Sequence, residues 1–214
     1  IFKEIIHAIP PLRDTGDWWN AWGLRKSWSK RMPFLILWEY LFICNLMFLI
    51  GFLDDLKIKI SPFRRLILMI IFLFLCIRLM PIEILNIDIP FLSTLLDNNT
   101  FSSLFVLLCF LFVINGANLI DGFNGLLAIN LIIINSILAY INLADGINEF
   151  SVVIIGQIII LFSFLLFNFP SAKIFLGDSG SYLLGSLVAL NVIITNNLNP
   201  DYSPFLFEYF FYQL

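Results

Sequence analysis

The chain has 214 residues, of which 60% are hydrophobic and only 13% are charged. Soluble domains carry roughly a quarter charged residues, so this composition excludes a soluble globular protein and indicates an integral membrane protein. The net charge of −3 and the lack of a basic patch exclude a nucleic-acid partner.

Long apolar runs, such as "LILMIIFLFLCIRLM", predict transmembrane helices. A helix needs roughly 20 apolar residues to cross about 30 Å of hydrocarbon, and the alternation typical of membrane β-strands is absent. We therefore expect an all-α fold, a polytopic transmembrane helical bundle. In chain order the predicted spans cover residues 34–53, 65–82, 104–119, 125–143, 151–169 and 181–196, and a seventh begins near Pro204.

The chain divides into an atypical polar and aromatic segment, residues 1–33, and a membrane domain, residues 34–214. The first residue is not Met, and the last residues, "FLFEYFFYQL", lie inside an apolar run. We therefore expect this chain to be a fragment whose membrane domain continues beyond Leu214.

The connections between the spans alternate between the two sides of the membrane. The first, third and fifth connections carry Lys57, Lys59, Arg64, Arg65 and Lys173, whereas the second, fourth and sixth carry acidic residues without any Lys or Arg. Positive residues favour the inner side, so we expect the first set to face the cytoplasm of a bacterial inner membrane. Residues 1–33 hold six Lys and Arg on the other side of the first span and do not follow this rule.

Four aspartates fall at the predicted cytoplasmic ends of spans. Asp54 and Asp55 lie in "GFLDDL", Asp121 lies in "NGANLIDGFNGLLA" and Asp178 lies in "IFLGDSGS", each beside a glycine and an apolar run. A carboxylate at a membrane boundary is costly unless it is paired, solvated or bound to a cation. We therefore expect these connections to form a cleft of oxygen ligands for Mg²⁺ and a phosphate.

Each of these motifs also has a structural interpretation. "GFLDDL" is compatible with a solvated helix end, "DGFNG" with a tight turn, and "GDSGS" with a helix N-cap at Ser179 or Ser181. The similar "ADGINEF" falls on the opposite side and is interpreted as a turn only. Taken one at a time, the motifs leave these alternatives open.

Together, and in this order, "GFLDDL", "NGANLIDGFNGLLA" and "FNFPSAKIFLGDSGSYLLG" resemble the polyprenyl-phosphate N-acetylhexosamine-1-phosphate transferase family. This is the glycosyltransferase family 4 group related to phospho-N-acetylmuramoyl-pentapeptide transferase, and the resemblance covers about residues 34–196. It implies an enzyme that transfers a sugar-1-phosphate from a UDP-sugar to undecaprenyl phosphate, releasing UMP, with Mg²⁺ or Mn²⁺ as cofactor. The implied partners are the two substrates and the bilayer, and a homodimer is considered as well.

The resemblance also implies roles for single residues. Asp54, Asp55 and Asp178 are the expected catalytic residues, and Asp178 and Asp121 are the expected metal ligands. The expected substrate-binding residues are Asn115, Asn118, Asp121, Asn168 and Lys173.

The chain departs from the family pattern at three places. Asn124 stands where many members have a second Asp, Ile58 stands where the muramoyl branch has a Lys, and the expected His-rich loop would lie beyond Leu214. The missing Lys favours a simple UDP-N-acetylhexosamine as donor, for O-antigen, capsule or a similar glycan, and the missing loop predicts that the fragment itself is inactive.

A transporter or a non-catalytic membrane protein is the alternative. A transporter is expected to carry polar groups near the middle of the membrane. Here the middles of the spans are apolar apart from Asn130, Asn135, Gln157 and Ser163, which we expect to bond between helices.

Overall fold

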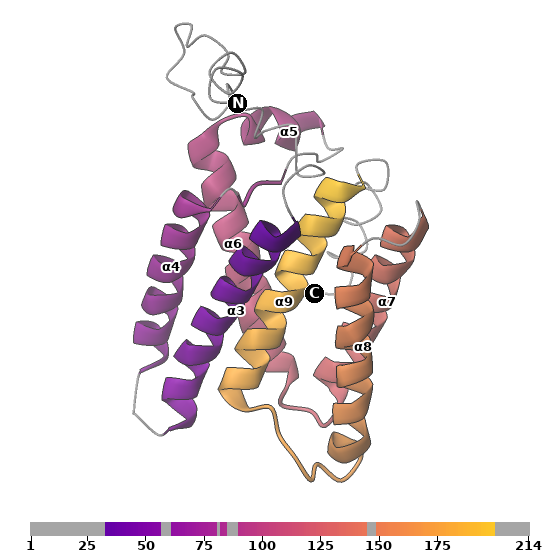
Figure 1. Ribbon diagram of the computed structural model, residues 1–214. Helices are drawn as coiled ribbons and strands as arrows, with labels where there is room; N and C mark the ends of the chain where they lie inside the picture. Colours follow the sequence, from indigo (N-terminus) through magenta and orange to yellow (C-terminus); the bar gives the residue numbers. More distant parts are fainter. Residues whose placement is uncertain (1–32, 57–60, 81, 85–89, 145–148, 200–214) are drawn as a thin grey trace, which may run out of the picture.

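The all-α bundle is confirmed. A computed structural model describes residues 33–56, 61–80, 82–84, 90–144 and 149–199, and within them all regular structure is helical (Figure 1). The elements are α3 (Pro33–Asp55), α4 (Pro62–Leu79), α5 (Pro90–Leu96), α6 (Asn99–Ile120), α7 (Leu126–Ala144), α8 (Glu149–Asn168) and α9 (Gly177–Leu198). Residues 1–32 and the predicted seventh span lie outside the described residues.

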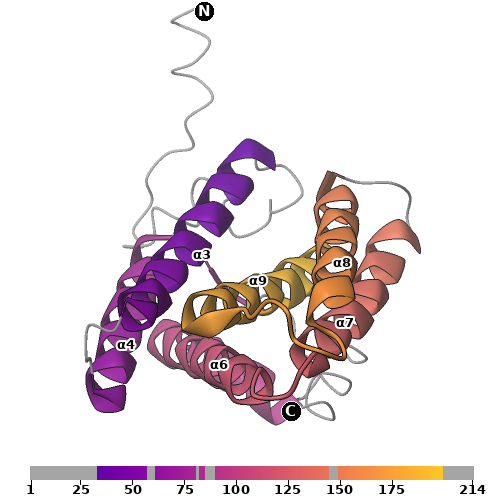
Figure 2. The ribbon, with the colours of Figure 1, turned by 90° about the horizontal axis from the view of Figure 1, so that it is seen from below.

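Helix α9 forms the centre of the bundle. It packs against α3, α6 and α7, while α4 lies beside α3 and α6, and α8 pairs with α7 (Figure 2). In the α9 span 78% of the residues are buried, against 17% in α8, so α9 is an interior helix and α8 a peripheral one. Gly185 of α9 permits this packing, because a Cβ there would lie 2.8 Å from the Cα of Ile114 in α6.

Each of the six predicted spans corresponds to one long helix. Four helices in the described part of the chain are long and apolar enough to cross a membrane, namely α6, most of α7 and α8, and α9. The other two, α3 and α4, have 23 and 18 residues and carry charged residues near their ends. At 1.5 Å per residue they measure about 34 and 27 Å, comparable to the hydrocarbon thickness.

Local sequence signals explain several helix ends. Helix α4 begins with Pro62 in its first turn, where the missing N–H is not needed. Helix α6 begins five residues before the predicted span, because the Asn98 side chain accepts hydrogen bonds from the N–H groups of Thr100 and Phe101. Helix α9 begins four residues before its predicted span, so Asp178 lies within its first turn.

The first, third and fifth connections meet at one end of the bundle, as predicted. Helices α3, α6 and α8 end there, and α4, α7 and α9 begin there (Figure 1). We call this the carboxylate end, since it contains Asp54, Asp55, Asp121 and Asp178.

A polar cluster joins four helices in the interior of the bundle. Asn191 of α9 accepts a hydrogen bond from the Tyr40 hydroxyl at 2.8 Å and donates to Asn135 at 2.9 Å and to Gln157 at 2.7 Å. Asn135 and Gln157 therefore bond between helices as predicted, whereas Ser163 bonds to the Ile159 carbonyl of its own helix. Because these side chains bond one another, the cluster fits a helix–helix tie better than a transport pathway.

Replacing Asn191 by Ala should lower the free energy of unfolding by about 2 kcal/mol, because it removes one interhelical hydrogen bond from each of its partners on three other helices. Thermal unfolding in detergent measures this loss. Ser163→Ala, which removes only an intrahelical bond, should change the melting temperature little. Equal effects of the two substitutions would contradict the interhelical role.

Candidate functional site at the carboxylate end

An arginine holds two of the four aspartates together. Arg65, in the first turn of α4, donates through the same Nη1 to Asp54 Oδ2 at 2.7 Å and to Asp178 Oδ2. The side chains of Arg65, Asp54 and Asp178 are 17%, 26% and 27% exposed, so solvent screens these ion pairs less than pairs on an open surface. Two connections distant in sequence, the first and the fifth, thus contribute to one charged cluster. Sequence reasoning counted Arg65 only as a positive residue of the first connection, although "SPFRR" follows the paired acids closely.

Asp178 is held on its other side by α6. Asn118 Nδ2 donates to Asp178 Oδ1 at 2.8 Å and to Ser181 Oγ at 2.9 Å, and the Ser181 hydroxyl donates to the Asp178 carbonyl at 3.2 Å. Both carboxylate oxygens of Asp178 therefore have partners from neighbouring helices. The interpretation of "GDSGS" as an N-cap at Ser179 or Ser181 is wrong, because Leu176 occupies the N-cap position and both serines lie inside the helix.

Asp55 points to a different partner from its neighbour Asp54. Its Oδ1 accepts a hydrogen bond from the Asp178 backbone N–H at 3.0 Å, and its Oδ2 accepts one from the Ser179 backbone N–H at 3.0 Å. The two adjacent acids therefore contact different parts of the same turn, Asp54 through the Arg65 ion pair and Asp55 through the backbone.

Asp121 forms the end of α6 next to this cluster. Its own N–H donates to the Ala117 carbonyl, and its side chain is half-buried. Burial, with a smaller contribution from the Asp178 carboxylate, raises the pKa of Asp121 to about 6. The sequence predicted Asp121 and Asp178 as the two metal ligands, and that role stays a prediction.

The pKa of Asp121 predicts a pH-dependent stability. Because the folded pKa lies above the ordinary value of 3.8, the folded protein holds a proton between about pH 4 and pH 6 that the unfolded chain has lost. The contribution of Asp121 to stability is therefore present below pH 4, declines as the pH rises through 6, and is constant above it. Asp121→Asn should remove this decline in melting temperatures measured without divalent cations, and Asp97→Asn, at the opposite end, should retain it. An unchanged slope in Asp121→Asn would contradict the burial argument.

The comparisons with known proteins agree with the motifs at this end. Residues 37–196 match the family model of glycosyl transferase family 4. The chain belongs to glycosyl transferase family 4. The match begins in α3 and ends in α9, so it includes the Arg65 cluster and all four aspartates of the carboxylate end.

Curated relatives within this family carry the name phospho-N-acetylmuramoyl-pentapeptide-transferase. The protein of Streptococcus thermophilus (strain CNRZ 1066) is 35% identical over 161 residues, which are 70% of this chain and 46% of the relative. That of Clostridium perfringens (strain 13 / Type A) is 32% identical over 154 residues, 68% of this chain and 48% of the relative. The protein of Latilactobacillus sakei is 34% identical over 170 residues, which are 74% of this chain and 52% of the relative. The chain thus spans about half the length of the curated relatives it matches.

The other residues predicted for the family site have more local contacts. Asn115 donates to the Leu111 carbonyl of its own helix at 2.7 Å. Asn168, buried at the end of α8, donates to the Ile174 carbonyl at 2.8 Å and so braces the connection to α9. Lys173 is exposed on that connection, and Asn124 donates to the Pro170 carbonyl at 3.2 Å. Their roles toward substrate stay predictions.

The donor set at the carboxylate end suits a hard divalent cation. In the described part of the chain, no group of three or more His, Cys, Asp or Glu side chains lies close enough to hold a metal ion. However, Asp54 and Asp178 direct one oxygen each at the same cationic nitrogen of Arg65, so these carboxylates already converge on a positive charge. Mg²⁺ needs only one or two carboxylates, with water and substrate oxygens as further ligands. The residues therefore fit Mg²⁺ or Mn²⁺.

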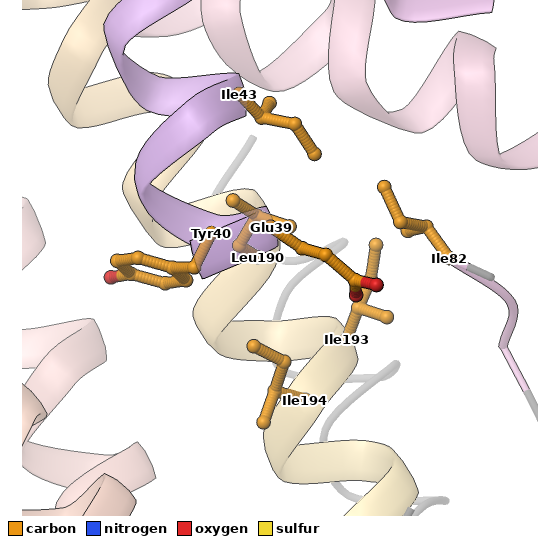
Figure 3. A pocket seen from close by; sticks show the side chains of 7 residues that line it. All are labelled: Glu39, Tyr40, Ile43, Ile82, Leu190, Ile193 and Ile194. Carbon is orange, nitrogen blue, oxygen red and sulfur yellow. The ribbon is translucent and has the colours of Figure 1, made fainter. Parts of the chain in front are cut away.

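A small apolar cavity lies away from the carboxylate end. Its lining side chains come from α3, from Ile82 after α4, and from Leu190, Ile193 and Ile194 of α9, and Glu39 extends over it (Figure 3). Its volume of about 10 Å³ is room for about one water molecule. A nucleotide sugar does not fit there, so the carboxylate end remains the candidate site.

Proposed function

We propose that the full-length protein transfers an N-acetylhexosamine-1-phosphate from a UDP-sugar to undecaprenyl phosphate and releases UMP. The observation that carries this proposal is the meeting of Asp54, Arg65 and Asp178, from three different helices, at one end of a membrane bundle of glycosyl transferase family 4. A reaction between a lipid phosphate and a soluble nucleotide sugar needs such a site at the membrane boundary, where both substrates arrive.

In the proposed reaction an oxygen of the lipid phosphate attacks the β-phosphorus of the UDP-sugar. The bond between that phosphorus and the oxygen bridging to the α-phosphate breaks, and UMP leaves with the bridging oxygen. Phosphoryl transfer of this kind depends mainly on positioning and on neutralising charge. Arg65 supplies a fixed positive charge beside the two carboxylates of Asp54 and Asp178.

Asp178, with Asp121 as its neighbour, would hold Mg²⁺ or Mn²⁺, and the ion would neutralise phosphate charge when bound. Asn118 and Arg65 orient the Asp178 carboxylate from both sides. Of the adjacent acids Asp54 and Asp55, Asp54 has its carboxylate in the charged cluster with Arg65 and Asp178. Asp54 is therefore the better candidate for accepting a proton from the lipid phosphate.

The sugar is the finer part of the proposal. The departure at Ile58 favours a simple UDP-N-acetylhexosamine and an O-antigen, capsule or similar glycan, whereas the relatives are named for the muramoyl-pentapeptide substrate. Both donors share a UDP group and an N-acetylated amino sugar, which is the substrate class proposed. Homodimer formation stays a prediction.

One assay tests the reaction, the sugar and the membrane side. Sealed vesicles from bacteria expressing the full-length protein receive labelled UDP-GlcNAc, UDP-GalNAc or UDP-MurNAc-pentapeptide, and lipid-linked product and UMP are measured. UDP-sugars do not cross the bilayer, so a cytoplasmic carboxylate end predicts transfer in inside-out vesicles and none in right-side-out vesicles. Transfer of the muramoyl donor alone would reject the simple-sugar proposal, and no transfer of any donor would reject the reaction.

A further inference from the structure

The start of α9 obtains its hydrogen-bond acceptors from another helix. The first N–H groups of a helix have no partner within the helix, and a side chain at the N-cap usually accepts from them. In α9 the N-cap residue is Leu176, which has no side-chain acceptor. Instead, the two oxygens of Asp55 accept from the N–H groups of Asp178 and Ser179, 123 and 124 residues away in sequence. A negative charge at this position is also favoured by the helix dipole.

Two glycines make room for this contact. Gly177 has φ +68°, and a Cβ there would lie 2.8 Å from Asp55 Oδ2. Gly51 lies one turn before Asp55 on the same face of α3, and a Cβ there would lie 2.4 Å from the Asp178 carbonyl oxygen. The end of α3 and the start of α9 are therefore in direct backbone contact, with no space for a side chain between them.

We propose that Asp55 is a positioning residue, which fixes the first turn of α9 so that the Asp178 carboxylate stays between Arg65 and Asn118. The two adjacent acids of "GFLDDL" then have different tasks. Asp54 belongs to the charged cluster. Both carboxylate oxygens of Asp55 accept hydrogen bonds from backbone N–H groups, so Asp55 affects the reaction only by positioning Asp178. The effect on transfer rests on the proposed function, whereas the effect on the α9 backbone does not.

A graded pair of substitutions in the full-length protein separates positioning from proton transfer. Asp55→Asn keeps one acceptor oxygen and Asp55→Ala keeps none. Positioning therefore predicts a graded fall in kcat, about tenfold for Asn, which loses one of the two hydrogen bonds to the start of α9, and about a hundredfold for Ala, which loses both. KM for the UDP-sugar should stay within about twofold, and the pH profile of kcat should keep its shape. A proton-accepting Asp55 predicts equal losses in both variants and a missing limb in the pH profile.

Hydrogen–deuterium exchange without substrates tests the contact itself. Peptides covering residues 174–184 should exchange about tenfold faster in Asp55→Ala, while α7 and α8 stay unchanged. Gly51→Ala should give the same local change with the Asp55 carboxylate present. The matched control is Gly156→Ala on α8, where a Cβ would meet nothing within 4 Å and exchange and kcat should be unchanged. Unchanged exchange in Asp55→Ala would overturn the positioning role, even if the wild-type protein catalyses the transfer. Faster exchange in Asp55→Ala, combined with a wild-type protein that transfers no sugar, would reject only the proposed function.

Discussion

Asp178→Asn should reduce kcat in the full-length protein by about a thousandfold or more, equivalent to about 4 kcal/mol of transition-state stabilisation. The Asp178 side chain contacts α4 and α6 at once, and it is the proposed metal ligand. Asn lacks the negative charge, and its amide group would face the donor of either Arg65 or Asn118. Asp178→Glu should also be poor, since the longer side chain displaces the carboxylate and Mg²⁺ tolerates little displacement.

The measurement is kcat over a Mg²⁺ titration at a temperature at which each variant is folded. Some loss of melting temperature is expected, because the substitution also removes the ion pair with Arg65. Asp97→Asn, at the opposite end of the bundle, controls for the loss of one negative charge and should retain full activity. An Asp178→Asn protein with normal kcat and normal Mg²⁺ dependence would contradict the metal-ligand proposal.

Much of the architecture follows from the sequence because hydrophobic length and loop parity are strong constraints. The six apolar runs each became a helix, and alternation of the connections correctly brought Asp54, Asp121 and Asp178 to one end. The short helix α5 was not predicted, since its seven residues lack a full hydrophobic pattern and contain a polar Ser93–Thr94 pair.

The finer features of the site depend on tertiary contacts that no local signal encodes. Asp54 and Asp55 are neighbours in sequence, but successive residues on a helix point about 100° apart, so the motif could not show which acid faces which partner. The start of α9 was placed too late because Leu176 is not a capping residue, and its acceptor comes from α3. Arg65 was recognised as a charge and not as a site residue, because its two partners lie 11 and 113 residues away.

Arg65→Ala should both lower activity by about a hundredfold and make the protein less stable when no divalent cation is present. Without the guanidinium, the carboxylates of Asp54 and Asp178 face each other without a positive partner, and like charges at this separation repel. Breaking a buried pair costs about 3–5 kcal/mol and an exposed one under about 1 kcal/mol, so about 2 kcal/mol is expected for this half-buried cluster.

The same substitution tests whether the cluster is a cation site. If Asp54 and Asp178 converge on a place that a metal ion can occupy, Mg²⁺ should raise the melting temperature of Arg65→Ala more than that of the wild type, because the ion no longer competes with the guanidinium. Arg64→Ala is the matched control, since Arg64 is the exposed neighbour in the same turn, and it should respond to Mg²⁺ like the wild type. Thermal unfolding in detergent with and without Mg²⁺ measures all three proteins. An Arg65→Ala protein that is destabilised but gains nothing from Mg²⁺ would show that Asp54 and Asp178 serve together only as ion-pair partners of Arg65, and would leave Asp178 and Asp121 alone as the proposed metal ligands.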